Sequence, residues 1–312
     1  MKRKLEGYFP QIANDPRNSI CEFVRYGYVG VSASLAQRER TARRLSLKYM
    51  LTYPTVLSIL LTLFNIAAAA ELATVRGKTV MVVQAHPDDA ESRCAGTVAL
   101  LKKNGNKIVY VVCSNDDKGT YDQKATLKSQ AALRKSEEEQ AVKVLGVDVL
   151  EWLGYEDGWV DMVPKDKLRG NIVRMIRRHH PDILLAFDPR NVDEHMDHRA
   201  SAFAAMDAVT ASPFPLYYPE HLSKEKLAPW EVAEVYYYDT PAANIWIDIG
   251  NTIETKIDAL AKHASQKGTD REAIARGMKA KAERDGKDHG IHYAEALRSA
   301  EIYVGVTPAK SP

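Results

Sequence analysis

Short apolar runs rich in β-branched residues alternate with longer stretches of helical periodicity from residue 78 onward. A short apolar run bounded by turn residues is typical of a strand buried on both faces. Such runs predict strands at 79–85, 107–113, 149–153, 182–187, 232–238 and 244–249. The stretches between them predict helices at 97–103, 125–145, 165–180, 199–211 and 252–266. Strands that alternate with helices through short connections indicate βαβ units and a parallel sheet with right-handed crossovers.

The expected fold class is therefore α/β. We predict a Rossmann-like, mostly parallel sheet with helices on both faces, in a single catalytic domain over residues 77–306. The stretch 267–290 is charged, contains glycine and is weakly helical, so we predict a mobile surface excursion there. Residues 307–312 form a short tail.

The N-terminal part of the chain follows a different pattern. Residues 1–50 are basic and polar without clear periodicity and predict a poorly structured leader, and an apolar segment with a linker follows over 51–76. Positive residues at 43–48 and the alanines at 67–70 complete the three parts of a secretory signal. We predict a signal, cleaved after Ala70, or a membrane anchor, with a buried helix as the alternative. A working signal implies an exported or membrane-anchored, extracytoplasmic protein; otherwise we expect a cytoplasmic one.

Composition narrows the function. The formal net charge of +2 over 312 residues does not suggest a polyanion-binding protein, so nucleic acid is not an expected partner. The three cysteines, Cys21, Cys94 and Cys113, have no zinc-knuckle or CxxC spacing. Any metal must therefore be held by histidines and carboxylates.

Such side chains gather directly after two of the predicted strands. His86, Asp88 and Asp89 follow the strand at 79–85, and His195 and His198 follow the strand at 182–187. Ligands of open α/β sheets bind beyond the carboxyl ends of the strands. Three nitrogen or oxygen ligands plus water describe an open catalytic zinc site. The alternative is an aspartate pair that caps a helix and ordinary histidines, but two clusters at two exits of one sheet favour the metal.

The same residues resemble the motifs of a known family. Ala85-His86-Pro87-Asp88-Asp89, with Ala95-Gly96-Thr97, resembles the signature of the PIG-L/LmbE-like deacetylases, and His195-Met196-Asp197-His198 resembles their second motif. Further similar segments include 117–120, 134–137 and 263–266, and the resemblance runs from about Lys78 to Tyr303. The family usually has Gly-Gly at 95–96, a departure that touches no proposed ligand.

The resemblance implies a role for each residue. His86, Asp89 and His198 would bind zinc, and Asp88 would be the general base. His195 would stabilise the tetrahedral oxyanion or protonate the leaving nitrogen. Asp197 would orient a ligand histidine, or else cap its helix. Arg134 is a candidate substrate contact, with an exposed ion pair to Glu137 as the alternative.

The function that the resemblance implies is a zinc-dependent N-deacetylase, an amide hydrolase that removes the N-acetyl group from an N-acetylglucosamine-type sugar or conjugate. One Zn²⁺ per chain is expected, and iron(II) fits the same ligands. The alternatives are a zinc amidase for a thiol conjugate or lipid-linked sugar, and a non-catalytic carbohydrate-binding protein, which has no need of an unligated carboxylate beside the metal. A metal-dependent glycosyltransferase is disfavoured, because no glycine-rich phosphate loop follows the first strand. Membrane contact through residues 51–70 and a homo-oligomer are left open.

Overall fold

The computed structural model describes residues 69, 71–191 and 195–300. The predicted leader over 1–50, nearly all of the predicted signal or anchor over 51–70, and the tail over 307–312 lie outside this part of the chain. Among the helices that are described, none combines the length and the apolar character needed to cross a membrane.

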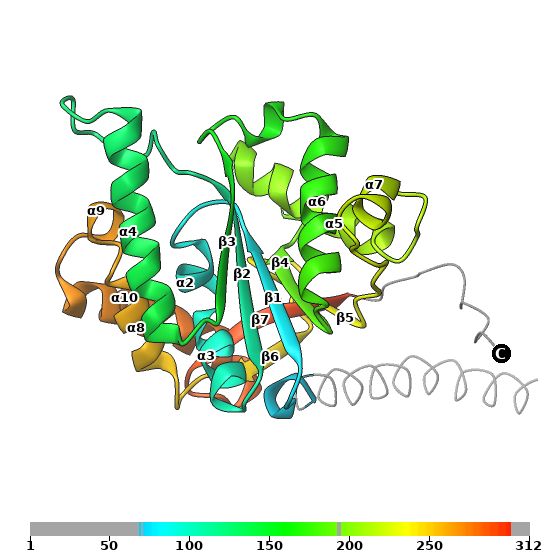
Figure 1. Ribbon diagram of the computed structural model, residues 1–312. Coiled ribbons are helices and arrows are strands. Elements are labelled where there is room, and N and C mark those ends of the chain that lie inside the picture. The colour runs from blue at the N-terminus through cyan, green and yellow to red at the C-terminus, as the bar shows by residue number, and fades with distance from the viewer. Residues whose placement is uncertain (1–68, 70, 192–194, 301–312) are drawn as a thin grey trace, which may run out of the picture. The chain divides into compact units, whose positions relative to one another are not determined.

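Within the described residues, the strands form one sheet in the order β3-β2-β1-β4-β5-β7-β6 (Figure 1). Neighbouring pairs among β1 to β5 are parallel, whereas β7 is antiparallel to both β5 and β6. The strands are β1 (Thr79–Gln84), β2 (Lys107–Ser114), β3 (Val149–Tyr155), β4 (Ile183–Phe187), β5 (Glu234–Tyr238), β6 (Ile245–Asp248) and β7 (Ala294–Ala300). The mostly parallel α/β sheet predicted from the sequence is confirmed.

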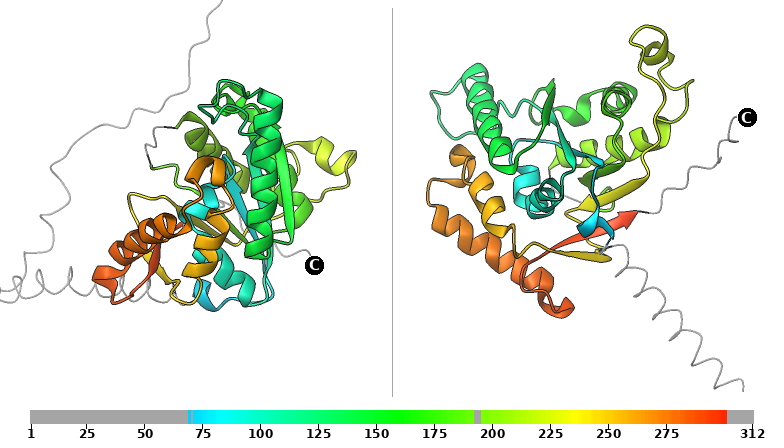
Figure 2. Two further views of the ribbon diagram at one scale, coloured as in Figure 1. Left: turned by 90° about the vertical axis from the view of Figure 1, so that its left-hand side faces the viewer. Right: turned by 60° about the horizontal axis from the view of Figure 1, so that its bottom comes forward.

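Helices cover both faces of the sheet, as two views show (Figures 1 and 2). The strand residues alternate between two apolar cores: Val80 and Val82 face the core under α3, α4 and α8, and Met81 and Val83 face the core under α5 and α6. The helices are α2 (Asp89–Arg93), α3 (Ala95–Lys103), α4 (Leu127–Leu145), α5 (Lys165–His179), α6 (Met196–Ala211), α7 (Pro219–Ser223), α8 (Ile253–Leu260), α9 (Ala264–Lys267) and α10 (Arg271–Gly286). Short 3-10 helices span Val160–Met162 and Lys287–His289.

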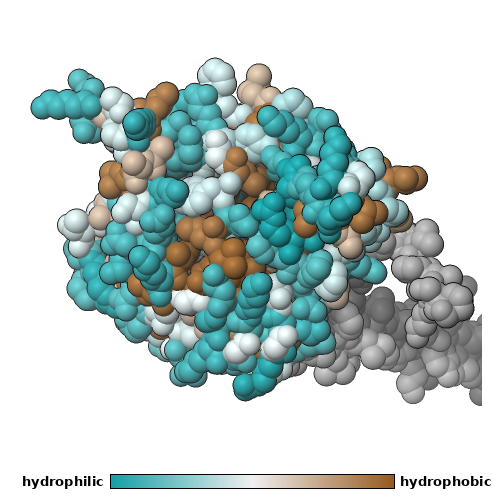
Figure 3. All heavy atoms as spheres, in the orientation of Figure 1, coloured by the Kyte–Doolittle hydropathy of each residue, from teal (hydrophilic) through white to brown (hydrophobic). Residues whose placement is uncertain are grey.

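Strand β3 is one edge of the sheet. Nearly all of its residues are half-buried rather than buried. Apolar side chains gather over this edge in the view of Figure 3, whereas the surrounding surface is mostly hydrophilic.

The prediction of a surface excursion at 267–290 is wrong. Most of it is the regular helix α10, which Asp270 caps by accepting hydrogen bonds from the backbone N–H groups of Glu272 and Ala273 (both 3.0 Å). Ile274 and Ala282 bury its inner face. Because few apolar side chains are needed to cover this end of the core, the helical periodicity is weak in the sequence.

The predicted helix at 252–266 is divided into α8 and α9. His263 lies between them with non-helical backbone angles, and its side chain is fully buried. The helix therefore ends where this histidine enters the protein interior.

The order of the strands decides where the site lies. The connection after β1 leads to β2 on one side, and β4 later joins β1 on the other side. Ligands of open α/β sheets bind at such a reversal, outside the carboxyl ends of the strands. The exits of β1 and β4 are therefore neighbours, although they are far apart in the sequence.

Candidate active site

The turn after β1 carries the first group of candidate residues. Asp89 Oδ2 accepts a hydrogen bond from the backbone N–H of His86 (2.7 Å), which closes the turn. Asp88 has a φ of 86°, in the left-handed region that aspartate adopts more readily than most residues. The turn leads directly into α2, which begins at Asp89.

The segment after β4 carries the second group. His195 precedes α6, and its Nδ1 accepts a hydrogen bond from the backbone N–H of Asp197 (3.2 Å). His198 lies one turn further and stacks on Phe187 at the end of β4, with ring centroids 4.4 Å apart. The helix start and the strand end therefore fix both imidazoles.

Candidate ligand atoms of three residues, His86, Asp89 and His198, converge between these segments. His86 Nδ1 lies 3.2 Å from His198 Nε2 and 3.5 Å from Asp89 Oδ2. His198 Nε2 lies 3.1 Å from Asp89 Oδ1. Ligands at about 2.0–2.1 Å from a tetrahedral ion are separated by about 3.3 Å. The donor set and its spacing therefore fit a zinc-sized cation.

His195 lies at the same centre, with its ring centroid 4.5 Å from that of His86 and 4.9 Å from that of His198. One nitrogen from each of the three imidazoles can be chosen within 4.8 Å of the others. Asp89 and His195 are therefore both candidates for the third ligand beside His86 and His198.

The far side of the His86 ring is held by two carboxylates. His86 Nε2 lies 3.2 Å from Asp197 Oδ2 and 3.2 Å from Asp157 Oδ1. A carboxylate only accepts, so Nε2 carries a proton, and in the neutral form of the ring the Nδ1 lone pair faces Asp89 and His198. Asp197 is fully buried and also accepts from the backbone N–H groups of Gly158 (2.7 Å) and Val160 (3.0 Å). It therefore ties the ligand histidine to the loop after β3.

The site is electrostatically suited to a cation. Burial opposes a charge on His86, but hydrogen bonds with Asp157, Asp197 and Asp89 outweigh it and raise the pKa of this imidazole well above its usual value. Burial likewise opposes ionisation of Asp89, yet His198 and His86 hold its pKa well below the usual value. The pKa of His195 is lowered by burial and by the neighbouring histidines. The carboxylates of Asp89, Asp157 and Asp197 thus surround the candidate metal site with negative charge.

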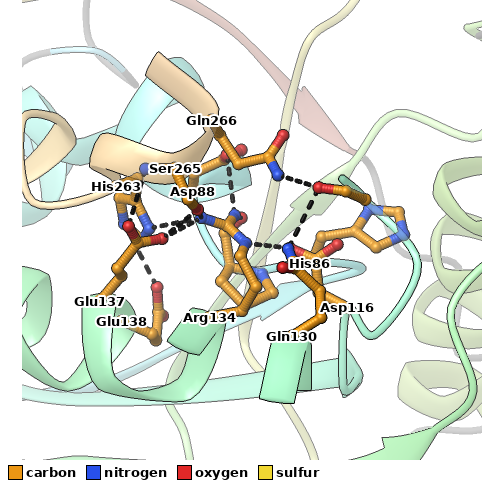
Figure 4. Close-up of polar contacts among 12 residues, drawn as sticks. His86, Asp88, Asp116, Gln130, Arg134, Glu137, Glu138, His263, Ser265 and Gln266 are labelled. Carbon is orange, nitrogen blue, oxygen red and sulfur yellow. Dashed lines mark hydrogen bonds and ion pairs between the residues drawn. The ribbon is translucent and has the colours of Figure 1, made fainter. Parts of the chain in front are cut away.

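Asp88 is a carboxylate that does not belong to this ligand set. Its Oδ2 lies 3.0 Å from Arg134 Nη2 and 3.4 Å from Lys267 Nζ. Burial raises its pKa, against the opposing charge of Lys267. Figure 4 shows Asp88 meeting Arg134 on one side of His86.

Arg134 holds this carboxylate from behind. Its guanidinium group has five N–H donors. Nε donates to Asp116, Nη1 to Glu137 (2.6 Å) and Ser265 (3.4 Å), and Nη2 to the Pro87 carbonyl (2.7 Å) and Asp88 (3.0 Å). Figure 4 shows this arrangement.

One expectation for Arg134 is therefore corrected. The residue is 1% exposed, so an ion pair on a solvated helix face is wrong. Its N–H donors have protein acceptors, and the substrate contact stays a prediction. The guanidinium contributes to the pocket wall behind Asp88.

A second buried cluster lies beyond Arg134. The side chains of Glu91, Glu138 and His263 are fully buried, and His263 Nε2 lies 3.6 Å from Glu138 Oε2 and 3.9 Å from Glu91 Oε2. Glu138 Oε1 accepts a hydrogen bond from Gln84 Nε2 (2.7 Å). Burial raises the pKa of Glu91 to about 8 and that of Glu138 well above its usual value. The Glu91 carboxyl therefore holds a proton near neutral pH.

The candidate residues line one pocket with a volume of about 250 Å³. The structure brings together five of the residues singled out from the sequence: His86, Asp88, Asp89, His195 and His198 all line it. Asp197 lies behind His86. The wall is completed by Pro87, Ser92, Arg93, Asp116, Gly119, Arg134, Asp157, Gln266 and Lys267.

Sequence reasoning missed Asp116, Asp157 and Lys267 as site residues. Asp116 and Asp157 follow β2 and β3, at the same sheet edge as the ligand motifs. Searching the carboxyl ends of all strands, as was done for β1 and β4, would have found both aspartates. A single acid in a loop has no spacing signal, however, and Lys267 fell in the stretch predicted to be a surface excursion.

Comparison with known proteins agrees with this geometry. A family model described as PIG-L, GlcNAc-PI de-N-acetylase, matches residues 81–209. The chain is 30% identical to diacetylchitobiose deacetylase of Thermococcus kodakarensis over 234 residues, which cover 74% of this chain and 86% of that protein.

The chain is also similar to a solved structure and to a second relative. The solved structure of N,N'-diacetylchitobiose deacetylase from Pyrococcus horikoshii matches with a TM-score of 0.67 at 29% identity, covering 75% of this chain and 88% of that chain. The chain is also 28% identical to mycothiol S-conjugate amidase of Streptomyces coelicolor, over 51% of this chain and 59% of that protein.

Proposed function

The chain belongs to the PIG-L family of de-N-acetylases, and we propose from this that it is a metal-dependent hydrolase of N-acetylglucosamine-type sugars. One observation carries the proposal. An unligated carboxylate, that of Asp88, lies in the same pocket as three donors spaced for a single cation. A site that only bound sugar would not require that carboxylate.

The proposed ligands are His86, Asp89 and His198, and zinc is the proposed metal because nitrogen and oxygen donors at tetrahedral spacing suit it. A bound divalent cation supplies Lewis-acid chemistry, since it polarises the acetyl carbonyl and makes a water molecule more acidic. Asp157 and Asp197 keep the Nδ1 lone pair of His86 directed at the ligand centre.

Asp88 is the proposed general base. Its carboxylate accepts a proton from the attacking water and returns it to the amine nitrogen as the C–N bond breaks. Arg134 fixes the orientation of this carboxylate through Nη2, which also binds the carbonyl of the preceding residue. Because the carboxylate is already held in place, less entropy is lost when the transition state forms.

His195 is the proposed oxyanion donor. Its Nδ1 accepts a backbone hydrogen bond, so the neutral ring carries its proton on Nε2. A donor of this kind beside the ligand centre stabilises the oxygen that gains negative charge in the tetrahedral intermediate.

The test compares wild type with Asp88→Asn, using the full chain loaded with zinc. Acetate release is measured on N-acetylglucosamine and N,N'-diacetylchitobiose, and bound metal is measured by elemental analysis. We expect Asp88→Asn to retain zinc and to lose about 10²–10⁴-fold in kcat, the usual contribution of a general base. Unchanged turnover in this variant would remove Asp88 from the mechanism.

A second candidate function is an amidase for an N-acyl thiol conjugate, which the similarity to mycothiol S-conjugate amidase favours. The same proposed metal and base serve either amide. Including a mycothiol-type conjugate among the assayed substrates decides between the two by the ratio of kcat/KM values.

A further inference from the structure

The pocket is too small for a whole oligosaccharide. Its volume of about 250 Å³ lies below the range of sites that enclose a drug-sized ligand. It therefore suits one N-acetylated pyranose, and any unit attached to that sugar must lie on the surface around the opening.

Trp159 lies in the loop after β3, which contributes Asp157 to the pocket wall. Asp157, two residues earlier, lines the pocket, and the backbone N–H groups of Gly158 and Val160 on either side of Trp159 both bind Asp197. The indole is 57% exposed, although Trp is usually well covered. An exposed Trp beside a polar pocket is a typical binding anchor.

The indole is also held in place. Lys118 Nζ lies 4.7 Å from the centre of its ring. The same ammonium donates to the carbonyl of Asp157 (2.6 Å) and pairs with Glu156 (2.8 Å). A cation fixed over one face restrains the ring, so little side-chain entropy remains to be lost when a ligand binds.

The surroundings of Trp159 favour a sugar over an acyl chain. Lys118 lies over the indole and pairs with Glu156 Oε1 (2.8 Å), so charged groups lie beside the ring. A pyranose matches this chemistry, because its C–H face packs on an aromatic ring while its hydroxyl groups reach charged neighbours.

We propose that Trp159 is a substrate platform for the sugar unit attached to the N-acetylglucosamine residue in the pocket. The proposal rests on the proposed deacetylase function and narrows its substrate class to oligosaccharides of two or more pyranose units. Trp159 thereby determines specificity and takes no part in the chemical step.

The experiment measures kcat/KM for N,N'-diacetylchitobiose and for N-acetylglucosamine with the zinc-loaded full chain. We expect Trp159→Ala to lower the ratio of the two values about tenfold, mainly through KM for the disaccharide, because one stacking contact is lost. Trp159→Phe should recover part of the ratio. Binding of the deacetylated disaccharide should change the tryptophan fluorescence of wild type and not that of Trp159→Phe.

Phe203→Ala is the matched control, since Phe203 is an aromatic side chain of similar exposure, 51%, that does not line the pocket. It should leave the ratio unchanged. Equal effects of Trp159→Ala on both substrates, or no effect on either, would overturn the platform. Failure of wild type to release acetate from either sugar would instead reject the deacetylase function, and the platform with it.

Discussion

At the scale of single residues, Arg134 fixes the orientation of the Asp88 carboxylate, the proposed general base. Its five donors bind Asp116, Glu137, Ser265, the Pro87 carbonyl and Asp88. A lysine keeps the charge at this position but cannot reproduce the fork of donors. The two residues should therefore differ in how well they orient Asp88.

We expect Arg134→Lys to lower kcat about ten- to a hundredfold with little change in KM, because the misplaced group is the base. The loss of charge-assisted hydrogen bonds should lower the free energy of unfolding by about 1.5–3 kcal/mol. Steady-state kinetics and urea denaturation measure the two effects. A raised KM with unchanged kcat would instead support the substrate contact that was predicted for Arg134 from the sequence.

The candidate ligand residues could be singled out from the sequence because they occur in pairs. His86 with Asp89, and His195 with His198, have spacings that have few structural explanations. Asp157 could not be found in this way, although it contacts His86, because one acid in a loop is indistinguishable from a solvated one. The contact depends on the loop after β3 returning to β1, which only the fold reveals.

At the scale of elements, the cluster of Glu91, Glu138 and His263 joins α2, α4 and the segment before α9. Its carboxyls have folded-state pKa values raised by burial, with that of Glu91 near 8. The folded state therefore binds protons more tightly than the unfolded chain. The stability that this protonation contributes is present below the unfolded pKa of 4.5 and falls as the pH rises towards 8.

Glu138→Gln replaces a carboxyl whose pKa is raised by burial with a neutral amide of the same shape. We expect the variant to fold and to show a shallower loss of stability between pH 5 and 8, by at most about 1.4 kcal/mol per pH unit for one proton. Urea denaturation of the zinc-loaded protein at several pH values measures the slope. Glu139→Gln, at an exposed position of the same helix, should retain the wild-type slope. Equal slopes in all three proteins would show that the pair is ionised.

Elements were predicted well where the pattern was strongly apolar and poorly where burial involves charge. Strand β7 was not predicted, because its sequence Ala-Glu-Ala-Leu-Arg-Ser-Ala has no apolar run. Its buried Glu295 pairs with Lys256 (2.6 Å) and its buried Arg298 with Asp188 (2.6 Å). Partners distant in the sequence neutralise both charges, so a local pattern cannot reveal the strand.

At the scale of the whole molecule, the proposed metal would join the two halves of the sheet. Three donors from the turn after β1 and the start of α6 lie within 3.5 Å of one another. A cation that binds only the folded state stabilises it by mass action, by about 2.7 kcal/mol at a hundred times its Kd.

Removal of the metal with a chelator should therefore lower Tm by roughly 5–10 °C for a domain of this size, and added zinc should restore it. Differential scanning fluorimetry measures the shift. His198→Ala lacks one ligand and should respond to neither the chelator nor zinc. If the Tm of wild type changed with neither the chelator nor zinc, no stabilising ion would bind at these residues.

The separation of the two ligand segments also orders events during biosynthesis. His198 follows His86 by 112 positions, and β4 can join β1 only after the whole β2–α5 excursion has been made. A nascent chain that ends before α6, which begins at Met196, lacks His198 and presents only His86 and Asp89 of the three proposed ligands. All three proposed ligands can therefore hold the proposed metal only after the chain has emerged through His198 and β4 has paired with β1.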